Sequence, residues 1–353
     1  MLKIKSYQSQ VSVENIPDLK RKKQNHKAVN LKIVVIVVML AVLFTDCSNT
    51  DSFSNIDSEK NFPTQESARN GQPSFKGSVL KVTKVGNDLK ITFKLHAQFF
   101  TMVLTEETNG YFELVKNAMS KGLVLNVYLK EGTNEIIKVD KVSAAEQESF
   151  NARFKTKRVG VANNLQTVLP DLNTLKLMYE RIRNESCWIF HSFTQECIPF
   201  RYPVDGCYAR AHKMRQILTE NGYDCEKQFV YGNLRAQSLD KACCVNWCYH
   251  VAVLVSYKDD SGEIQKRIID PSLFKDGPVT ETDWRAACTN SNCGETNIVS
   301  YANTSGDTYY RGPKGKLFMY DDEYRNTDCV LNVFMRYKDC TPTPAPDVSF
   351  CSF

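Results

Sequence analysis

The sequence predicts an α+β protein in two parts, preceded by an export segment. Three observations carry this prediction. Runs of alternating apolar and polar residues begin near residue 75, after a long polar stretch. An amphipathic helical run begins after Asp205, and all cysteines except Cys47 lie between Cys187 and Cys351. With 353 residues and 42% hydrophobic content, the chain is long enough for about two domains.

The charge is distributed unevenly along the chain. Residues 1–164 contain 24 basic and 16 acidic residues, whereas residues 165–353 contain 21 basic and 24 acidic residues. The later part therefore lacks the basic character of a nucleic-acid-binding domain, and we expect no nucleic-acid partner.

Residues 1–47 predict an export signal. A basic stretch, LKRKKQNHKAVNLK, precedes the apolar run Ile33–Phe44, which at 12 residues is too short to span a bilayer. The long segment before this run predicts that the true translation start lies downstream. Cys47 lies where a bacterial lipoprotein signal places its lipidated cysteine, so lipidation and ordinary cleavage nearby both stay open. We expect a secreted, periplasmic or cell-surface bacterial protein.

Residues 48–74 are polar and predict a disordered spacer. Two hairpins are predicted next, SVLKVTKV with DLKITFKLHAQFF and LVLNVYLK with EIIKVDKV. Between them, YFELVKNAMSKG has helical spacing and ends at Gly122. These elements predict a small α+β domain over about residues 75–142, without a cysteine. The basic stretch NARFKTKRVGVANN that follows is typical of a protease-accessible linker.

Cys207 lies in the first turn of a predicted helix. Asp205 is a good N-cap residue, and the helix is indicated by an apolar stripe of Ala211, Met214, Ile217 and Leu218. Unpaired backbone N–H groups and the helix dipole stabilise a thiolate at such a position, and they can also receive an oxyanion. For a cysteine taken alone, a structural role as a half-cystine or a buried residue is the alternative.

His250 and Asp270 lie on two predicted strands joined by the DDSG turn. His250 lies ten residues before Asp260 and Asp270 ten after it, so an antiparallel hairpin makes them near neighbours. A carboxylate beside an imidazole orients its tautomer and stabilises the imidazolium. Taken singly, the histidine fits a core position and the aspartate a turn. The shared spacing favours a functional pair.

The 13 cysteines predict disulfides in an exported protein. If Cys207 stays a free thiol, a second cysteine of the remaining set must also be unpaired. Our candidate is Cys248, which shares a strand face with His250, although simple packing is its alternative role. A zinc site in CCVNWCYH is disfavoured because the spacing matches no common zinc motif. Ten cysteines remain for five disulfides: Cys187, Cys197, Cys225, Cys243, Cys244, Cys288, Cys293, Cys329, Cys340 and Cys351.

Several stretches resemble bacterial secreted protein glutaminase, a family of protein-glutamine deamidases related to the transglutaminase and papain-like cysteine hydrolases. They are FRYPVDGCYARAHKMRQIL, NGYDCEKQFVYGNL, YHVA, RIIDPSLF and PAPDVS. The resemblance covers most of residues 165–353. It implies a catalytic domain there, in which an N-terminal helix carries the cysteine and an antiparallel sheet carries the histidine and aspartate.

The resemblance implies an enzyme that hydrolyses glutamine side-chain amides within proteins to glutamate and ammonia through a cysteine thioester. The family's catalytic triad is carried over onto Cys207, His250 and Asp270, and no metal or organic cofactor is expected. At Cys248 the sequence departs from the serine expected in the family. That departure concerns the polarity of the cleft and leaves the triad unchanged.

Residues 75–164 resemble, more loosely, the prosegment of the family. We therefore expect an inhibitory prodomain and cleavable linker, with cleavage by a maturation protease between about residues 155 and 166. Ala97 and Gln98 are expected to lie in the cleft as a substrate mimic, and an ordinary strand of the prodomain is the alternative. The expected partners of this monomer are proteins or peptides with exposed glutamine, the maturation protease and its own prodomain.

Three other functions stay open. A transglutaminase would share the thioester but pass the acyl group to a lysine amine. A papain-like protease would cut backbone amides instead. In a disulfide-rich surface binding module without enzymatic activity, Cys207 would be purely structural.

Overall fold

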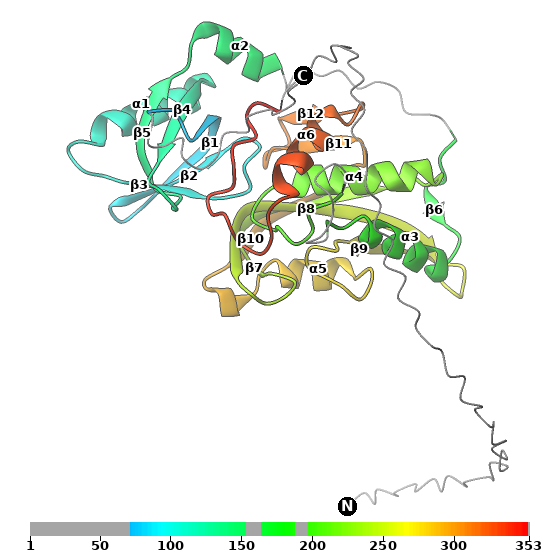
Figure 1. Cartoon of the computed structure of the whole chain (residues 1–353). Helices are drawn as coiled ribbons and strands as arrows, with labels where there is room; N and C mark the ends of the chain where they lie inside the picture. The colour runs from blue at the N-terminus through cyan, green and yellow to red at the C-terminus, as the bar shows by residue number, and fades with distance from the viewer. Residues whose placement is uncertain (1–70, 153–163, 188–196, 352–353) are drawn as a thin grey trace, which may run out of the picture. The chain divides into compact units, whose positions relative to one another are not determined.

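The structure, a computed structural model, describes residues 71–152, 164–187 and 197–351 (Figure 1). The predicted export signal 1–47 with Cys47, most of the spacer 48–74 and most of the proposed cleavage stretch 155–166 lie outside the described residues. Within the described ranges, no helix is long and apolar enough to cross a membrane.

The first part of the described chain is a five-stranded antiparallel sheet in the order β3-β2-β1-β4-β5. Helix α1 contacts this sheet, contributes Val115 and Ala118 to its core and ends at the left-handed Gly122 (φ 66°). Both predicted hairpins and this helix are confirmed, whereas helix α2 was not predicted. The elements are β1 (Phe75–Val85), β2 (Asp88–Phe93), β3 (Phe100–Val103), α1 (Asn109–Lys121), β4 (Val124–Leu129), β5 (Ile136–Lys141) and α2 (Ala144–Ala152).

The continuous strand predicted over residues 88–100 is wrong. Strand β2 ends at Phe93, and Leu95 adopts a left-handed backbone conformation (φ 64°) that is uncommon for a non-glycine residue. The chain leaves the sheet here and returns to it only in β3. As a result, Leu95 and Ala97 pack into the hydrophobic core formed mainly by residues 169–351, and not into the core of their own sheet.

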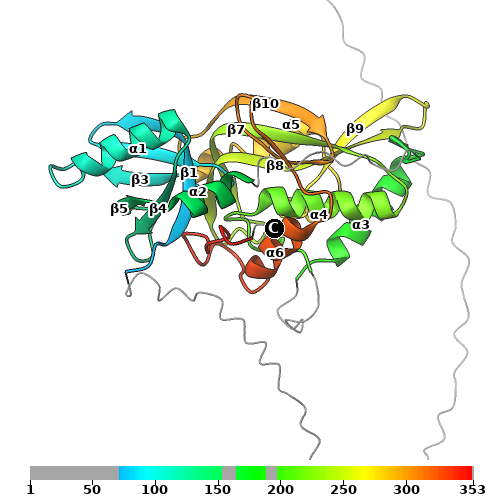
Figure 2. The ribbon, with the colours of Figure 1, turned by 90° about the horizontal axis from the view of Figure 1, so that it is seen from above.

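The second part is built on a sheet in the order β10-β7-β8-β6, with β9 paired to β8. Figure 1 shows α4 lying along β8, and Figure 2 shows the same arrangement from above. Helix α6 packs on α4, while α5 contacts β7 and β9. The elements are β6 (Val168–Leu169), α3 (Leu172–Asn184), α4 (Cys207–Glu220), β7 (Glu226–Gln237), β8 (Cys244–Lys258), β9 (Ile264–Ile269), α5 (Glu281–Ala287), the 3₁₀ helix η3 (Ser291–Cys293), β10 (Asn297–Ser305), β11 (Thr308–Arg311), β12 (Phe318–Tyr320) and α6 (Arg325–Phe334).

The beginning of strand β8 has one edge that β9 does not cover. Strand β9 pairs only with the later half of β8, Val253–Lys258. At Trp247 one edge of β8 pairs with Leu234 of β7, and the same residue also bridges to Gln98. Since a strand has only two edges, the segment around Gln98 occupies the edge that β9 leaves open.

Four disulfides use eight of the ten expected cysteines: Cys187–Cys197, Cys243–Cys340, Cys244–Cys293 and Cys329–Cys351. The expectation that Cys225 and Cys288 also belong to disulfides is wrong, because both are buried free thiols. Cys225 precedes the first residue of β7, whereas the carbonyl of Cys288 accepts a hydrogen bond from Arg235 near the other end of that strand. They are therefore separated by nearly the length of β7, roughly 30 Å at 3.3 Å per residue, far beyond disulfide reach.

Candidate active site

Cys207 is the first residue of α4, and its side chain is buried. The predicted N-cap is wrong by one position. Gly206 caps the helix in a left-handed conformation (φ 76°), while Asp205 lies just before it. The Asp205 carboxylate accepts a hydrogen bond from the Gly206 N–H (2.7 Å) and fixes the turn that leads into the helix. The tight turn brings Cys207 to the start of the helix, where backbone N–H groups have no intrahelical partner.

Gly206 is expected to tolerate no side chain. A Cβ at this position would lie 2.6 Å from ring atoms of Phe334, and the left-handed backbone adds strain. We expect Gly206→Ala to lower the free energy of unfolding by about 2–5 kcal/mol, measured by denaturant titration. The matched control is Gly222→Ala, also left-handed (φ 85°) but with open space around it, for which about 1–2 kcal/mol is expected. Equal losses in the two variants would contradict the close approach to Phe334.

His250 lies in β8 and bonds Asp270 just beyond the end of β9. The imidazole Nε2 lies 2.8 Å from the Asp270 Oδ2, and both side chains are buried. The predicted proximity is confirmed, although the strand register differs from the symmetric hairpin. Val253 pairs with Ile269, so the position opposite His250 is residue 272 and not Asp270. The side chains bridge this offset of two residues, since the His250 and Asp270 side chains are in hydrogen-bond contact.

Two tryptophans hold the imidazole of His250 between them. The ring of Trp247 stacks on it with a centroid distance of 4.3 Å and an interplanar angle of 7°. Trp284, from α5, stacks at 5.5 Å and also donates its indole N–H to the Asp270 Oδ2 at 2.9 Å. The Trp247 indole N–H in turn donates to the carbonyl of Pro203 at 3.0 Å, so its ring is fixed to the segment that precedes α4.

The carboxylate of Asp270 is held in its charged form. Burial alone would raise its pKa, but the charge and hydrogen bond of His250 and hydrogen bonds from Ser272 and Trp284 outweigh burial, and the pKa is lowered. The Ser272 backbone N–H and hydroxyl both donate to the Oδ1. An ionised Asp270 fixes the imidazole with Nε2 protonated and leaves Nδ1 as its basic nitrogen. Among the described residues, Nδ1 of His250 has no hydrogen-bond partner.

Cys207 lies against the strand that carries His250. Burial raises the pKa of the Cys207 thiol, and the backbone N–H of Val251, the residue after His250, lowers it by a smaller amount. Arg210, which donates to the Asp205 carbonyl at 2.6 Å, lowers it as well. Burial is nevertheless the dominant effect and raises the pKa of Cys207 to about 12. In this form of the protein the thiol is therefore protonated at neutral pH.

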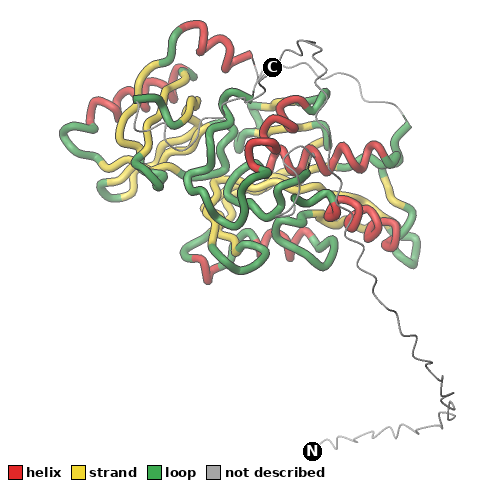
Figure 3. Tube along the Cα trace, viewed as in Figure 1, coloured by secondary structure: helices red, strands yellow, loops and turns green. Residues whose placement is uncertain are grey.

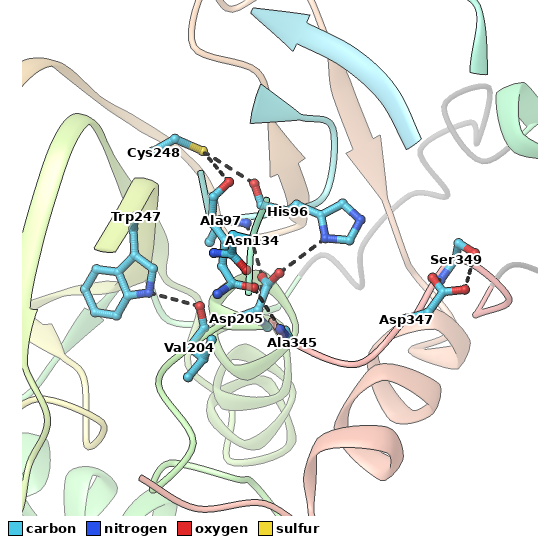
Figure 4. Close-up of polar contacts among 12 residues, drawn as sticks. His96, Ala97, Asn134, Val204, Asp205, Trp247, Cys248, Ala345, Asp347 and Ser349 are labelled. Atoms are coloured by element: carbon cyan, nitrogen blue, oxygen red, sulfur yellow. Dashed lines mark hydrogen bonds and ion pairs between the residues drawn. The ribbon is translucent and has the colours of Figure 1, made fainter. Parts of the chain in front are cut away.

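The segment around Ala97 lies over the residues that flank Cys207 and His250 (Figure 4). The N–H of Ala97 donates to the Oδ1 of Asp205 at 3.2 Å, and its carbonyl accepts from the Cys248 N–H at 2.6 Å. The Cys248 thiol donates to the carbonyl of His96 at 3.4 Å. The Nδ1 of His96 in turn lies 3.5 Å from the Oδ2 of Asp205. Both backbone groups of Ala97 are thus bound, as in an added antiparallel strand.

The side chain of Gln98 is directed to another part of the molecule. Its Oε1 accepts a hydrogen bond from the Ala345 N–H at 2.9 Å, and only 4% of the residue is exposed. The structure therefore brings the predicted Cys207, His250, Asp270, Cys248 and Ala97 to one region. Gln98 lies at its border, with the C-terminal residues.

Sequence reasoning did not identify Trp247, Trp284 or Ala345 as part of this site. Trp247 lies only three residues before His250, and this nearness was a usable signal. The positions of Trp284 and Ala345 depend on contacts between distant segments, and no local pattern marks them. The zinc alternative is removed, because Cys243 and Cys244 are both disulfide-bonded and have no thiolate to offer. Within the residues that the structure describes, no group of three His, Cys, Asp or Glu side chains could hold a metal ion.

Comparison with known proteins identifies the family of this chain. A family described as Glutaminase matches residues 175–288. The crystal structure of pro-protein-glutaminase is similar to this chain at 47% identity with a TM-score of 0.72, covering 80% of this chain and 99% of that one. The chain belongs to the protein-glutaminase family.

Protein-glutaminase structures without the pro part match a shorter share of the chain. The crystal structure of protein-glutaminase is 59% identical with a TM-score of 0.51 and covers 54% of this chain and 100% of that one. The NMR structure of protein-glutaminase from Chryseobacterium proteolyticum is 58% identical with a TM-score of 0.50, again over 54% of this chain and 100% of that one. A comparison with curated proteins gives no match. The chain is a protein-glutaminase precursor with the mixed α+β fold of the family.

Proposed function

We propose that the matured protein hydrolyses the side-chain amide of glutamine residues within proteins, releasing ammonia and leaving glutamate, and that it is made as an inactive precursor. The observation that carries the proposal is the similarity to pro-protein-glutaminase over 99% of that chain. It is supported by a site in which a cysteine begins a helix that packs on the strand carrying a histidine, and this histidine is hydrogen-bonded to an ionised aspartate. These residues have the chemistry of a nucleophile, a base and an orienting group.

Cys207 acts as the nucleophile. The Nδ1 of His250, which Asp270 leaves unbonded, takes the thiol proton, and the thiolate attacks the carboxamide carbon of the glutamine side chain. The carbonyl oxygen becomes an oxyanion, and backbone N–H groups at the start of α4 stabilise it. Each such donor is typically worth about 3–4 kcal/mol of transition-state stabilisation.

His250 then returns its proton to the leaving amide nitrogen, which departs as ammonia and leaves a thioester on Cys207. A water molecule, deprotonated by His250, attacks the thioester carbon. The carbon–sulfur bond breaks, glutamate is released, and the proton returns to the thiolate. Trp247 and Trp284 keep the imidazole plane fixed through both half-reactions because the ring lies between them.

We assign residues 165–353 to the transglutaminase and papain-like type of catalytic domain. The support is topological. The nucleophile begins a helix that packs along β8, the same strand carries the histidine, and the aspartate follows the adjoining antiparallel strand β9. A transglutaminase or protease on this core would differ only in the acyl acceptor or in the bond attacked.

We further propose that residues 75–164 act as an inhibitory prodomain and linker, with Ala97 in the position of the substrate glutamine. Ala97 is held on both sides by residues two positions before Cys207 and two before His250, namely Asp205 and Cys248. Its methyl group offers no amide to attack. Cleavage in the linker, by a protease of the export compartment, would free the cleft. The four disulfides support secretion, because such bonds persist in oxidising compartments.

The reactivity of Cys207 is expected to change on maturation. In the precursor, burial raises its pKa to about 12, so almost no thiolate exists at pH 8. Removal of the covering segment restores hydration and access. We expect alkylation by iodoacetamide at pH 8, located to Cys207 by peptide mapping, to be at least about 100-fold faster in the matured protein. An equal rate in precursor and matured protein would contradict the burial of the thiol by the prosegment.

The proposed function is tested with casein as substrate. Protease-matured protein is incubated with casein, ammonia is assayed, and intact mass is measured, with the uncleaved precursor as control. We expect one molecule of ammonia for each glutamine that exchanges its amide NH₂ for OH. The uncleaved precursor should release little ammonia and deamidate few glutamines. Cross-linked casein would favour a transglutaminase, and new chain termini a protease. Unchanged casein would favour the remaining alternative, a disulfide-rich surface binding module without enzymatic activity.

A further inference from the structure

The C-terminal tail, which we define as residues 340–351, contacts Gln98, the residue after Ala97. Figure 3 shows this stretch as loop, and Figure 4 shows Ala345 beside the residues around Ala97. The Ala345 N–H donates to the side-chain oxygen of Gln98 across 247 positions of the sequence. Because Gln98 is almost fully buried, this is a specific hydrogen bond and not a surface contact.

The tail is held in place independently of Gln98. The Cys243–Cys340 disulfide ties its beginning to the start of β8, and Cys329–Cys351 ties its end to α6. Between these two points, the carbonyl of Pro342 accepts a hydrogen bond from the buried Tyr202 hydroxyl at 2.7 Å. The Ala345 N–H is therefore a preorganised donor, so binding of a residue to it carries little entropic cost for ordering the tail.

The register of the bound segment identifies which position the tail contacts. Ala97 is bound through its N–H and its carbonyl and takes the reactive position. Side chains of consecutive residues in an extended chain point to opposite sides. The side chain of Gln98 accordingly lies away from that of Ala97 and meets the tail. A substrate bound in the same register would present to Ala345 the residue that follows its reactive glutamine.

We infer that the C-terminal tail forms a specificity subsite for the residue after the reactive glutamine, with the Ala345 N–H as its hydrogen-bond donor. This inference rests on the proposed function. The subsite favours a side chain that carries a carbonyl acceptor at the distance found in glutamine. Methionine has nearly the same length, but its thioether is only a weak acceptor. The preferred substrate segment is therefore one in which a second glutamine follows the reactive one.

The test compares two blocked peptides that are identical except for glutamine or methionine directly after the reactive glutamine. Initial rates of the matured enzyme are followed by tandem mass spectrometry, which separates deamidation at the first glutamine from that at the second. We expect kcat/KM at the first position to be about five-fold higher with the following glutamine, as for one neutral hydrogen bond. Equal kcat/KM values for the two peptides with the wild-type enzyme would by themselves overturn the inference.

The Ala345→Pro variant removes the donor, because proline has no backbone N–H. The expected result is that the ratio of kcat/KM between the two peptides falls to about one. The matched control, Ala345→Gly, keeps the N–H and the five-fold ratio. A preserved ratio in Ala345→Pro overturns the inference. Absence of ammonia from both peptides with wild-type enzyme would instead overturn the proposed function, and the inference with it.

Discussion

A Cys207→Ala variant of the matured protein is expected to release no measurable ammonia from casein. The proposed chemistry passes through a sulfur–carbon bond, and alanine offers no atom that can form it. Removing the nucleophile of a comparable triad costs roughly 10⁶-fold in kcat, so the residual rate should fall below detection. The side chain removed is small, and the start of α4 keeps the Gly206 turn, so the fold should be retained.

The matched control is Cys288→Ala, which removes another fully buried free thiol from the same part of the chain. Its activity should stay within a few-fold of wild type. Circular dichroism and thermal unfolding of both variants verify that the fold is intact. Undiminished ammonia release by Cys207→Ala would remove Cys207 from the mechanism, and equal loss in both variants would indicate general damage to the core.

An Asp270→Asn variant is expected to lose activity by about 10³–10⁴-fold, as when the orienting carboxylate of a serine-protease triad is replaced. Both oxygens of Asp270 accept only from donors: His250 and Trp284 on one oxygen and Ser272 on the other. The asparagine NH₂ must therefore face a donor in either orientation. The imidazole would lose its fixed tautomer, and kcat should fall while the affinity for protein substrate changes little.

The same substitution should change the acid stability of the protein. The pKa of Asp270 is lowered from 3.8, so its contribution to folding is complete above about pH 4 and is lost as the pH falls through the lower folded-state value. We expect Asp270→Asn to be less stable at neutral pH and to show a smaller further loss below pH 4. The matched control is Asp260→Asn, in the exposed turn between β8 and β9, which should keep wild-type activity and stability. If Asp260→Asn were as impaired as Asp270→Asn, the role of the His250 contact would be contradicted.

Much of the fold could be predicted because its signals are local. The apolar stripe of α4 and the alternating residues of the hairpins reflect the periods of a helix and a strand, which depend on neighbours only. Even the contact between His250 and Asp270 followed from a single hairpin. The prediction tolerated a register error of two residues because Asp270 lies just beyond the end of β9 and its side chain still reaches His250.

The rest depended on distances that no periodicity encodes. Counting cysteines placed Cys225 and Cys288 among the ten expected half-cystines, but both are free thiols, and their positions near opposite ends of β7 keep them from pairing with each other. The break at Leu95 occurs without a glycine that would predict it, although after this break Leu95 and Ala97 pack into the other hydrophobic core. Ala345 contacts Gln98 from a tail that two disulfides fix at its ends. Such contacts join residues that are far apart in the sequence, so no local sequence pattern predicts them.

The order of these parts along the chain also sets an order in time. The sheet whose β2–β3 connection contains Ala97 is complete by Lys141 and has a hydrophobic core of its own, whereas the residues that contact this connection extend from Asp205 to the tail at Ala345. A chain synthesised from its N-terminus therefore contains the covering segment before it contains Cys207. Under the proposed function, the inhibitor is made before the nucleophile that it inhibits, so no stage of synthesis exposes the nucleophile alone.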